Sequence, residues 1–182
     1  MLSDLDRMAL EAFADTIVPG RKRFPDDVAI AGVSDSAGAV EAGALDVLQD
    51  PATGIEDGIG GMAGLLNMHA RQYAEKIGAP VREGTEFVDL PYEARRSLIT
   101  TLTGPQTATR DLWFLLALFS YMAFDSSPHR PTRVTLEDPE SGLNAMGFAH
   151  PDADGRWRFI PSSYGRQLAR VKPGTDERGN LP

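Results

Sequence analysis

The sequence predicts a mainly α-helical protein in which about five helices form a compact bundle, followed by a long proline-rich coil. Apolar residues recur at helical spacing through residues 1–124, whereas seven of the 13 prolines lie after residue 125 and interrupt regular structure there. The 182-residue chain is long enough for one hydrophobic core, and its apolar fraction of 42% is ordinary for a globular protein. We therefore expect a helical domain over 1–124 and an extended, partner-wrapping segment over 125–182.

The first two helices of the bundle are separated by a long loop. Ser3 and Asp6 have the spacing of a capping box, and the apolar pattern that follows them ends at Pro19. The pattern resumes near Ala37 and stops before Pro51. The sequence thus predicts one helix from Ser3 and a second from about residue 37.

The third and fourth helices follow in the same way. Thr53 and Glu56 resemble a second capping box, which opens a helix that runs to about Ile77. Pro91 suits the first turn of a helix, because its missing N–H would be unpaired there in any case. That fourth helix is expected to end at Leu102, before a Gly-Pro pair.

The fifth predicted helix covers residues 108–124, with Thr107 as its expected cap. Its segment Leu112–Phe119 is apolar in every direction around the helix axis, and such a helix must be buried on every face. Four other helices of the same domain are one way to cover it. The other is a second protein, because interface cores favour aromatic residues and methionine.

The proline-rich segment after residue 125 has one local signal. The pair Asp154-Gly155 is typical of a tight turn, and Trp157 and Phe159 alternate after it, so a short β-hairpin near 147–160 is predicted. A coil with few internal hydrogen bonds gains order by wrapping a partner. The side chains that we expect at a partner interface come from these two regions: Trp113, Phe114, Phe119, Tyr121, Met122, Phe148, Trp157 and Phe159.

Charge and cysteine content exclude several classes of function. The net charge of −8 disfavours nucleic acid and anionic membranes as partners. Cysteine is absent, which removes disulfides, thiol catalysis and thiolate metal sites. The longest apolar run is far shorter than the roughly 20 residues of a membrane helix, and no secretory or twin-arginine signal is visible at the N-terminus. We expect a cytoplasmic protein with no membrane partner.

No motif predicts catalytic, cofactor-binding or metal-binding residues in this chain. The segment Gly58–Ala63 matches a glycine-rich dinucleotide fingerprint, but an acidic turn precedes it where a strand is required, so we expect its small residues to allow close helix packing. His69 lies on an apolar helix face and is expected to be a hydrogen-bonded core histidine. The acidic group around Glu86 is expected to be solvated or capping.

The order of five segments resembles the small subunit of gluconate 2-dehydrogenase-type enzymes, known as the subunit 3-like family. The likeness spans roughly residues 3–160. Within "FVDLPYEARRSLITTL", the family's spacing is matched by Phe87, Leu90, Arg95 and Leu98. The segments that carry the resemblance are "LEAFADTIVPG" (10–20), "AGAVEAGALDVL" (37–48), "FVDLPYEARRSLITTL" (87–102), "FDSSPHRP" (124–131) and "NAMGFAHPDADGRW" (144–157).

This resemblance implies a non-catalytic subunit that binds and stabilises, or helps to fold, a separate enzyme. In the family, the partner is an FAD-dependent large subunit of the glucose–methanol–choline type, which oxidises an alcohol or sugar hydroxyl. FAD is then expected in the partner and no cofactor in this chain. The alternative is an autonomous small helical enzyme or ligand-binding protein with a pocket in its helical core.

Overall fold

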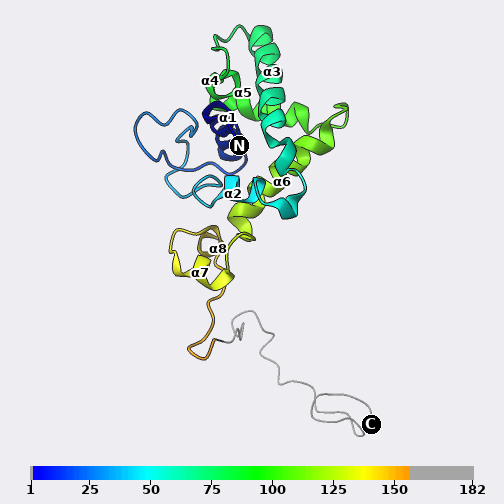
Figure 1. The fold of residues 1–182 in the computed structure, drawn as a ribbon. Coiled ribbons are helices and arrows are strands. Elements are labelled where there is room, and N and C mark those ends of the chain that lie inside the picture. The colour runs from blue at the N-terminus through cyan, green and yellow to red at the C-terminus, as the bar shows by residue number, and fades with distance from the viewer. Residues whose placement is uncertain (1, 156–182) are drawn as a thin grey trace, which may run out of the picture. The chain divides into compact units, whose positions relative to one another are not determined.

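The computed structural model describes residues 2–155 and confirms the mainly α-helical class. Within this range, the chain forms eight α-helices and two short 3-10 helices. Residues up to Phe148 make one compact unit, and residues from Ala149 onward belong to a second (Figure 1). The elements in chain order are α1 (Asp4–Ile17), α2 (Ala44–Leu48), η1 (Pro51–Thr53), η2 (Glu56–Gly58), α3 (Ile59–Ile77), α4 (Glu86–Asp89), α5 (Tyr92–Leu102), α6 (Arg110–Asp125), α7 (Thr132–Glu137) and α8 (Gly142–Ala145).

Helix α1 is the centre of the first unit and packs against α2, α3, α4, α5 and α6. Its predicted capping box is confirmed. The Asp6 backbone N–H donates to the Ser3 hydroxyl at 3.1 Å, and the Ser3 N–H donates to the Asp6 carboxylate at 3.2 Å. Because five helices surround it, the later turns of α1 are almost entirely buried, including Leu10 and Phe13.

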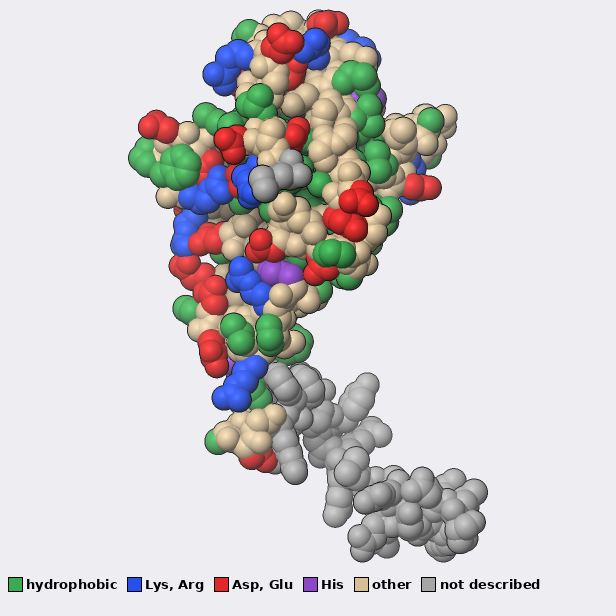
Figure 2. Space-filling model, viewed as in Figure 1, with side chains coloured by type: hydrophobic (Ala, Val, Ile, Leu, Met, Phe, Trp, Pro, Cys, Tyr) green, Lys and Arg blue, Asp and Glu red, His purple; other side chains and the backbone are tan. Residues whose placement is uncertain are grey.

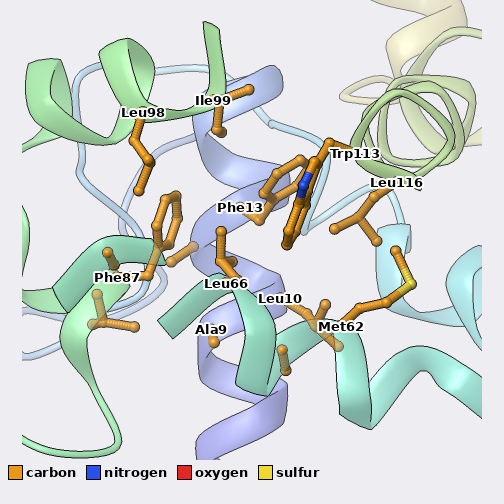
Figure 3. Close-up of a cluster of buried hydrophobic side chains, with 14 of the residues drawn as sticks. Ala9, Leu10, Phe13, Met62, Leu66, Phe87, Leu98, Ile99, Trp113 and Leu116 are labelled. Carbon is orange, nitrogen blue, oxygen red and sulfur yellow. The ribbon is translucent and has the colours of Figure 1, made fainter. Parts of the chain in front are cut away.

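Aromatic rings from three helices meet in the core. Phe13 of α1 lies between Phe87 of α4 and Trp113 of α6, with ring centroids 6.3 and 6.4 Å away (Figure 3). Leu66 of α3 and Leu116 of α6 are fully buried beside them. Helices that are far apart in the sequence are thus joined by one continuous apolar cluster.

The second predicted helix begins seven residues later than expected. Residues 39–43 form turns, and α2 starts at Ala44 because Gly43 has a left-handed backbone (φ +93°) that interrupts a helix. Gly38 also lies so close to Gly20 that a Cβ on Gly38 would be 2.5 Å from the Gly20 nitrogen. The Ala39 N–H donates to the Val18 carbonyl at 3.0 Å, so the two ends of the long loop pair directly.

Other boundaries differ from the prediction because local caps decide them. Helix α3 starts at Ile59, since the Thr53 hydroxyl bonds to the Asp50 carbonyl and does not cap the helix. Thr107 bonds backward to the Thr101 carbonyl, and α6 starts at Arg110. The expected proline-rich coil contains α7 and α8, so the compact unit extends past the predicted limit at residue 124. Pro131 precedes the first turn of α7, where a proline is tolerated.

Two buried charged side chains hold the long loop between α1 and α2. The Arg95 guanidinium donates to the Ala29 carbonyl at 2.9 Å and to the Val28 carbonyl at 3.2 Å. The Asp15 carboxylate accepts from the backbone N–H groups of Gly20 and Ala31, at 3.0 and 2.8 Å. Burial lowers the pKa of Arg95 and raises that of Asp15. These side chains provide bonds that the loop backbone, which has no helix of its own, would otherwise lack.

The same guanidinium joins the loop to α4 and α5. It donates to the Leu90 carbonyl at 3.0 Å and to the Val88 carbonyl, and it lies 6.0 Å from the Phe87 ring centroid. Arg95 therefore serves four carbonyl groups from two segments. It is 4% exposed, which leaves no room for water to replace it.

The described residues contain no helix that is long and apolar enough to span a membrane. The predicted hairpin near 147–160 is described only as far as residue 155, and residues 156–160 lie outside the described range. Its turn is partly visible, because the Gly155 N–H donates to the Asp152 carbonyl at 2.8 Å. The strands of this hairpin remain a prediction. The wrapping of a partner by residues 125–182 also remains a prediction.

Replacing Arg95 by alanine is expected to lower the free energy of unfolding by about 3 kcal/mol or more, because four carbonyls lose a charged donor in a dry site. The neighbouring Arg96→Ala provides the matched control. Arg96 is exposed and contacts Glu93 and the Tyr92 ring at the surface, so its loss should cost about 0.5 kcal/mol. Urea unfolding of both variants measures the difference, and equal losses would contradict this role of Arg95.

Candidate partner-binding surface

Helix α6 has one face in the core. Trp113, Leu116, Ser120 and Ala123 are fully buried, and their spacing of three or four residues places them on one side of the helix. The Ser120 hydroxyl donates to the Leu116 carbonyl at 2.7 Å, so the polar member of this face is hydrogen-bonded. This side of α6 therefore packs against the other helices of the bundle.

The opposite face of α6 is apolar and exposed. Phe114, Leu115, Leu118 and Tyr121 are 52%, 38%, 39% and 45% exposed, and we call these four residues the α6 stripe. The alternative in which the other helices of the domain cover every face of this helix is therefore wrong, and its cover by a second protein stays a prediction. Exposed apolar residues are common singly, but a contiguous row on one helix is typical of an interaction site.

The structure places the predicted interface residues in several different environments. Phe114 and Tyr121 lie on the α6 stripe, whereas Trp113 lies in the core, where a partner cannot reach it. Phe119 and Met122 are half-buried beside the stripe. The remaining three candidates are Phe148, which is 39% exposed at the end of the compact unit, and Trp157 and Phe159, which lie outside the described residues.

Two residues of the stripe, Leu115 and Leu118, were missed in the sequence. Leu118 lies about one turn from both Phe114 and Tyr121, and Leu115 lies about one turn before Leu118, so helical spacing alone would have identified them. We expected aromatic residues and methionine at an interface, and this criterion excluded the two leucines.

A hollow of about 200 Å³ lies beside the stripe, between α6 and the segment that links α2 to η1. Its apolar lining includes Val47, Phe119, Met122 and Pro128, and His129 also contributes. Burial and the nearby Arg130 lower the pKa of His129. The hollow thus extends the apolar area from the exposed side of α6 toward α2.

The glycine-rich segment Gly58–Ala63 also borders α6. We expected its small residues to allow close helix packing, but a Cβ on Gly58 or Gly61 would meet no atom within 4 Å. These two glycines instead line an open apolar groove together with Leu112 of α6. The close-packing interpretation is therefore wrong for them, although Ala63 is in the core.

The other chemistry candidates are occupied by structural contacts. Glu86 is buried and pairs with Arg71, so its expected exposure to solvent is wrong. Asp89 pairs with Arg82 at 2.6 Å, and hydrogen bonds from Arg82 lower the pKa of Asp89. Among the described residues, no group of three His, Cys, Asp or Glu side chains has metal-binding geometry.

His69 lies half-buried against the core. Its ring contacts the edge of Trp113, with centroids 5.7 Å apart, and burial lowers its pKa. The side chain thus belongs to the packing around α6, and the neutral imidazole is the form that the fold favours.

The residues that carry the closest family resemblance are internal. Phe87, Leu90, Arg95 and Leu98 are all buried, and Arg95 contacts both Phe87 and the Leu90 carbonyl. This part of the pattern therefore describes the core of the domain. It does not form a surface that a partner could contact.

On the face of the protein shown in Figure 2, acidic and basic side chains are interspersed and apolar side chains lie in separate groups. Several of the charges in the described residues belong to local ion pairs, such as Arg82–Asp89 and Arg96–Glu93. Ion pairs with exposed members contribute little to stability. The stripe on α6 differs because four apolar side chains adjoin along about two helical turns.

Comparison with known proteins gives one family. A family model described as "Family of unknown function (DUF5987)" matches residues 4–182, which is almost the whole chain. No curated protein and no solved structure matches the chain.

Leucines on the two faces of α6 are expected to respond differently to truncation. Leu116→Ala should lower the free energy of unfolding by about 3 kcal/mol, because it opens a cavity in the core. Leu118→Ala should change the free energy of unfolding by less than about 1 kcal/mol, because Leu118 has few core contacts. Chemical denaturation of the isolated chain tests the pair. A large loss for Leu118→Ala would assign the α6 stripe to the fold.

Stability is expected to fall as the pH is lowered through about 6.5, the ordinary histidine pKa. The folded state lowers the pKa of His69, so in this range the unfolded chain binds more protons and protonation favours unfolding. The contribution is fully present above pH 6.5 and is lost as the pH falls toward the folded pKa. Melting temperatures measured from pH 8 to 5 should therefore decline less in His69→Gln than in the unchanged chain. Parallel declines would contradict a role for His69.

Proposed function

The chain belongs to this DUF5987 family, and we propose that it is a non-catalytic small subunit that binds and stabilises, or helps to fold, a larger FAD-dependent enzyme. The proposed partner is a dehydrogenase or oxidase of the glucose–methanol–choline type, acting on an alcohol or sugar hydroxyl. FAD is bound by that partner. The observation that carries the proposal is the exposed α6 stripe.

The α6 stripe has the composition and size of an interface core. Burying a whole Leu or Phe side chain contributes roughly 1.5–3 kcal/mol, so covering the remaining exposed part of each stripe residue contributes about 1 kcal/mol. Four such residues together contribute roughly 4 kcal/mol before the costs of association. A stripe of this kind can anchor a complex, with the neighbouring hollow and groove adding contact area.

The α6 stripe supports the proposal that the partner is a protein. The sequence resemblance supports the proposal that this protein is a flavoprotein. Segments in the order of the gluconate 2-dehydrogenase small subunit extend over roughly residues 3–160. That order, and not the surface, favours a flavoprotein over another class of partner. A cytoplasmic complex is part of the proposal, because a chain without cysteine suits a reducing compartment.

Co-expression tests this proposal. The full chain, produced together with each glucose–methanol–choline flavoprotein of its own organism, is expected to co-elute with one of them in size-exclusion chromatography. The complex should have a fixed stoichiometry and flavin absorbance. Leu118→Glu should abolish co-elution, because it places a charge in the centre of the stripe.

Leu5→Glu is the matched control. Leu5 is 47% exposed and lies on α1, so the change has the same chemistry away from the α6 stripe. This variant should still co-elute with the flavoprotein. A folded chain that ignores every such flavoprotein would overturn the proposal, as would a complex that survives Leu118→Glu.

A further inference from the structure

The α6 stripe has the spacing of a helix–helix seam. Leu118 lies four positions after Phe114, three after Leu115 and three before Tyr121, and Asp111 and Asp125 lie seven residues before and after Leu118. Seven residues are two helical turns, so these aspartates mark the two ends of the stripe. An apolar row with this period accepts the side chains of a second helix between its own.

The surroundings of the stripe are acidic. The segment that contains Asp50, Glu56 and Asp57 runs along one side of α6, because its residues share the hollow with Met122 and the groove with Leu112. Asp50 is itself part of the lining of the hollow. A partner that covers the stripe must therefore approach a negative border.

Basic side chains near the two ends of α6 do not offset this border. The Arg110 guanidinium lies 3.6 Å from the Asp111 carboxylate and over the Phe114 ring. Arg130 lies 4.0 Å from Asp46. Both positive charges therefore already have an acidic neighbour.

The last turn of α6 also favours an external cation. It carries Asp125 and no basic residue, so a negative side chain adds to the negative end of the helix dipole. A lysine or arginine placed there by a partner would offset both. The first turn holds Asp111, whose side chain is 93% exposed and is therefore accessible to a partner although Arg110 lies beside it.

From this arrangement we infer that the α6 stripe binds an amphipathic helix of another protein, one with an apolar seam flanked by lysine or arginine. A second copy of this chain is the poorer occupant. Antiparallel self-pairing would set the acidic border of one copy against that of the other, and each chain carries a net charge of −8. The inference rests on the proposed function, since it describes the element by which the partner docks.

Two labelled peptides of identical length test the inference against the full chain by fluorescence anisotropy. Both are designed helices with leucine at the seam positions, and the flanking positions are lysine in one and glutamate in the other. The lysine peptide should bind at least about tenfold more tightly, and the difference should shrink with added salt. Equal binding of the two peptides would overturn the inference.

Two variants of equal charge separate docking from general attraction to an acidic protein. Leu118→Glu should lose the lysine peptide, whereas Leu5→Glu should retain it. Asp111→Lys combined with Asp125→Lys should reduce the preference for lysine at least several-fold. Loss of binding in both leucine variants, or in neither, would overturn the inference. So would a dimer of the chain that dissociates with Leu118→Glu.

The outcomes separate this inference from the proposed function. Binding of the lysine peptide without any flavoprotein complex would leave the docking mode standing and overturn the flavoprotein. A flavoprotein complex that depends on Leu118, together with equal binding of the two peptides, would support the proposed function and overturn the docking mode.

Discussion

The Arg95 guanidinium connects parts of the protein that no helix joins. It reaches the loop between α1 and α2 through two carbonyls, and α4 with its following residue through two more. Asp15 binds the same loop from the side of α1. Isolated buried charges are costly, yet here each is surrounded by backbone partners of complementary polarity. The loop can therefore close over the core without secondary structure, and α1 is enclosed on the side that α3 and α6 leave open.

The helices that could be predicted from the sequence are those whose ends are set locally. The Ser3–Asp6 capping box fixes the start of α1, and the Pro91 step fixes that of α5. The start of α2 could not be predicted because contact between Gly20 and Gly38, which are distant along the chain, holds the preceding residues, and the left-handed backbone of Gly43 then delays the helix. The role of Arg95 was hidden for the same reason, since all four of its partners lie outside α5 and its N-cap, and two of them belong to the distant loop between α1 and α2.

The sequence predicted which segment carries the candidate surface but not which face of the helix forms it. An apolar segment such as 112–119 shows that α6 needs covering, but its uniform composition does not indicate which side meets the core. The structure assigns Trp113 and Leu116 to the inside and Phe114 and Leu118 to the outside. Side-chain type misled here, because the tryptophan that looked most like an interface anchor packs on Phe13, whereas two plain leucines face outward.

The exposed parts of the stripe side chains take no part in the packing of the described compact unit. Helix α6 contacts α1, α2, α5 and α8, and its fully buried residues lie on the side opposite the stripe. An exposed apolar row adds a risk of aggregation without adding to the core. An apolar row on a helix bordered by carboxylates is explained if a binding partner covers the row when the protein functions. The acidic border then has a physical role as well. It disfavours the nearest available occupant, another copy of the same chain, and leaves the row free for a partner that carries the opposite charge.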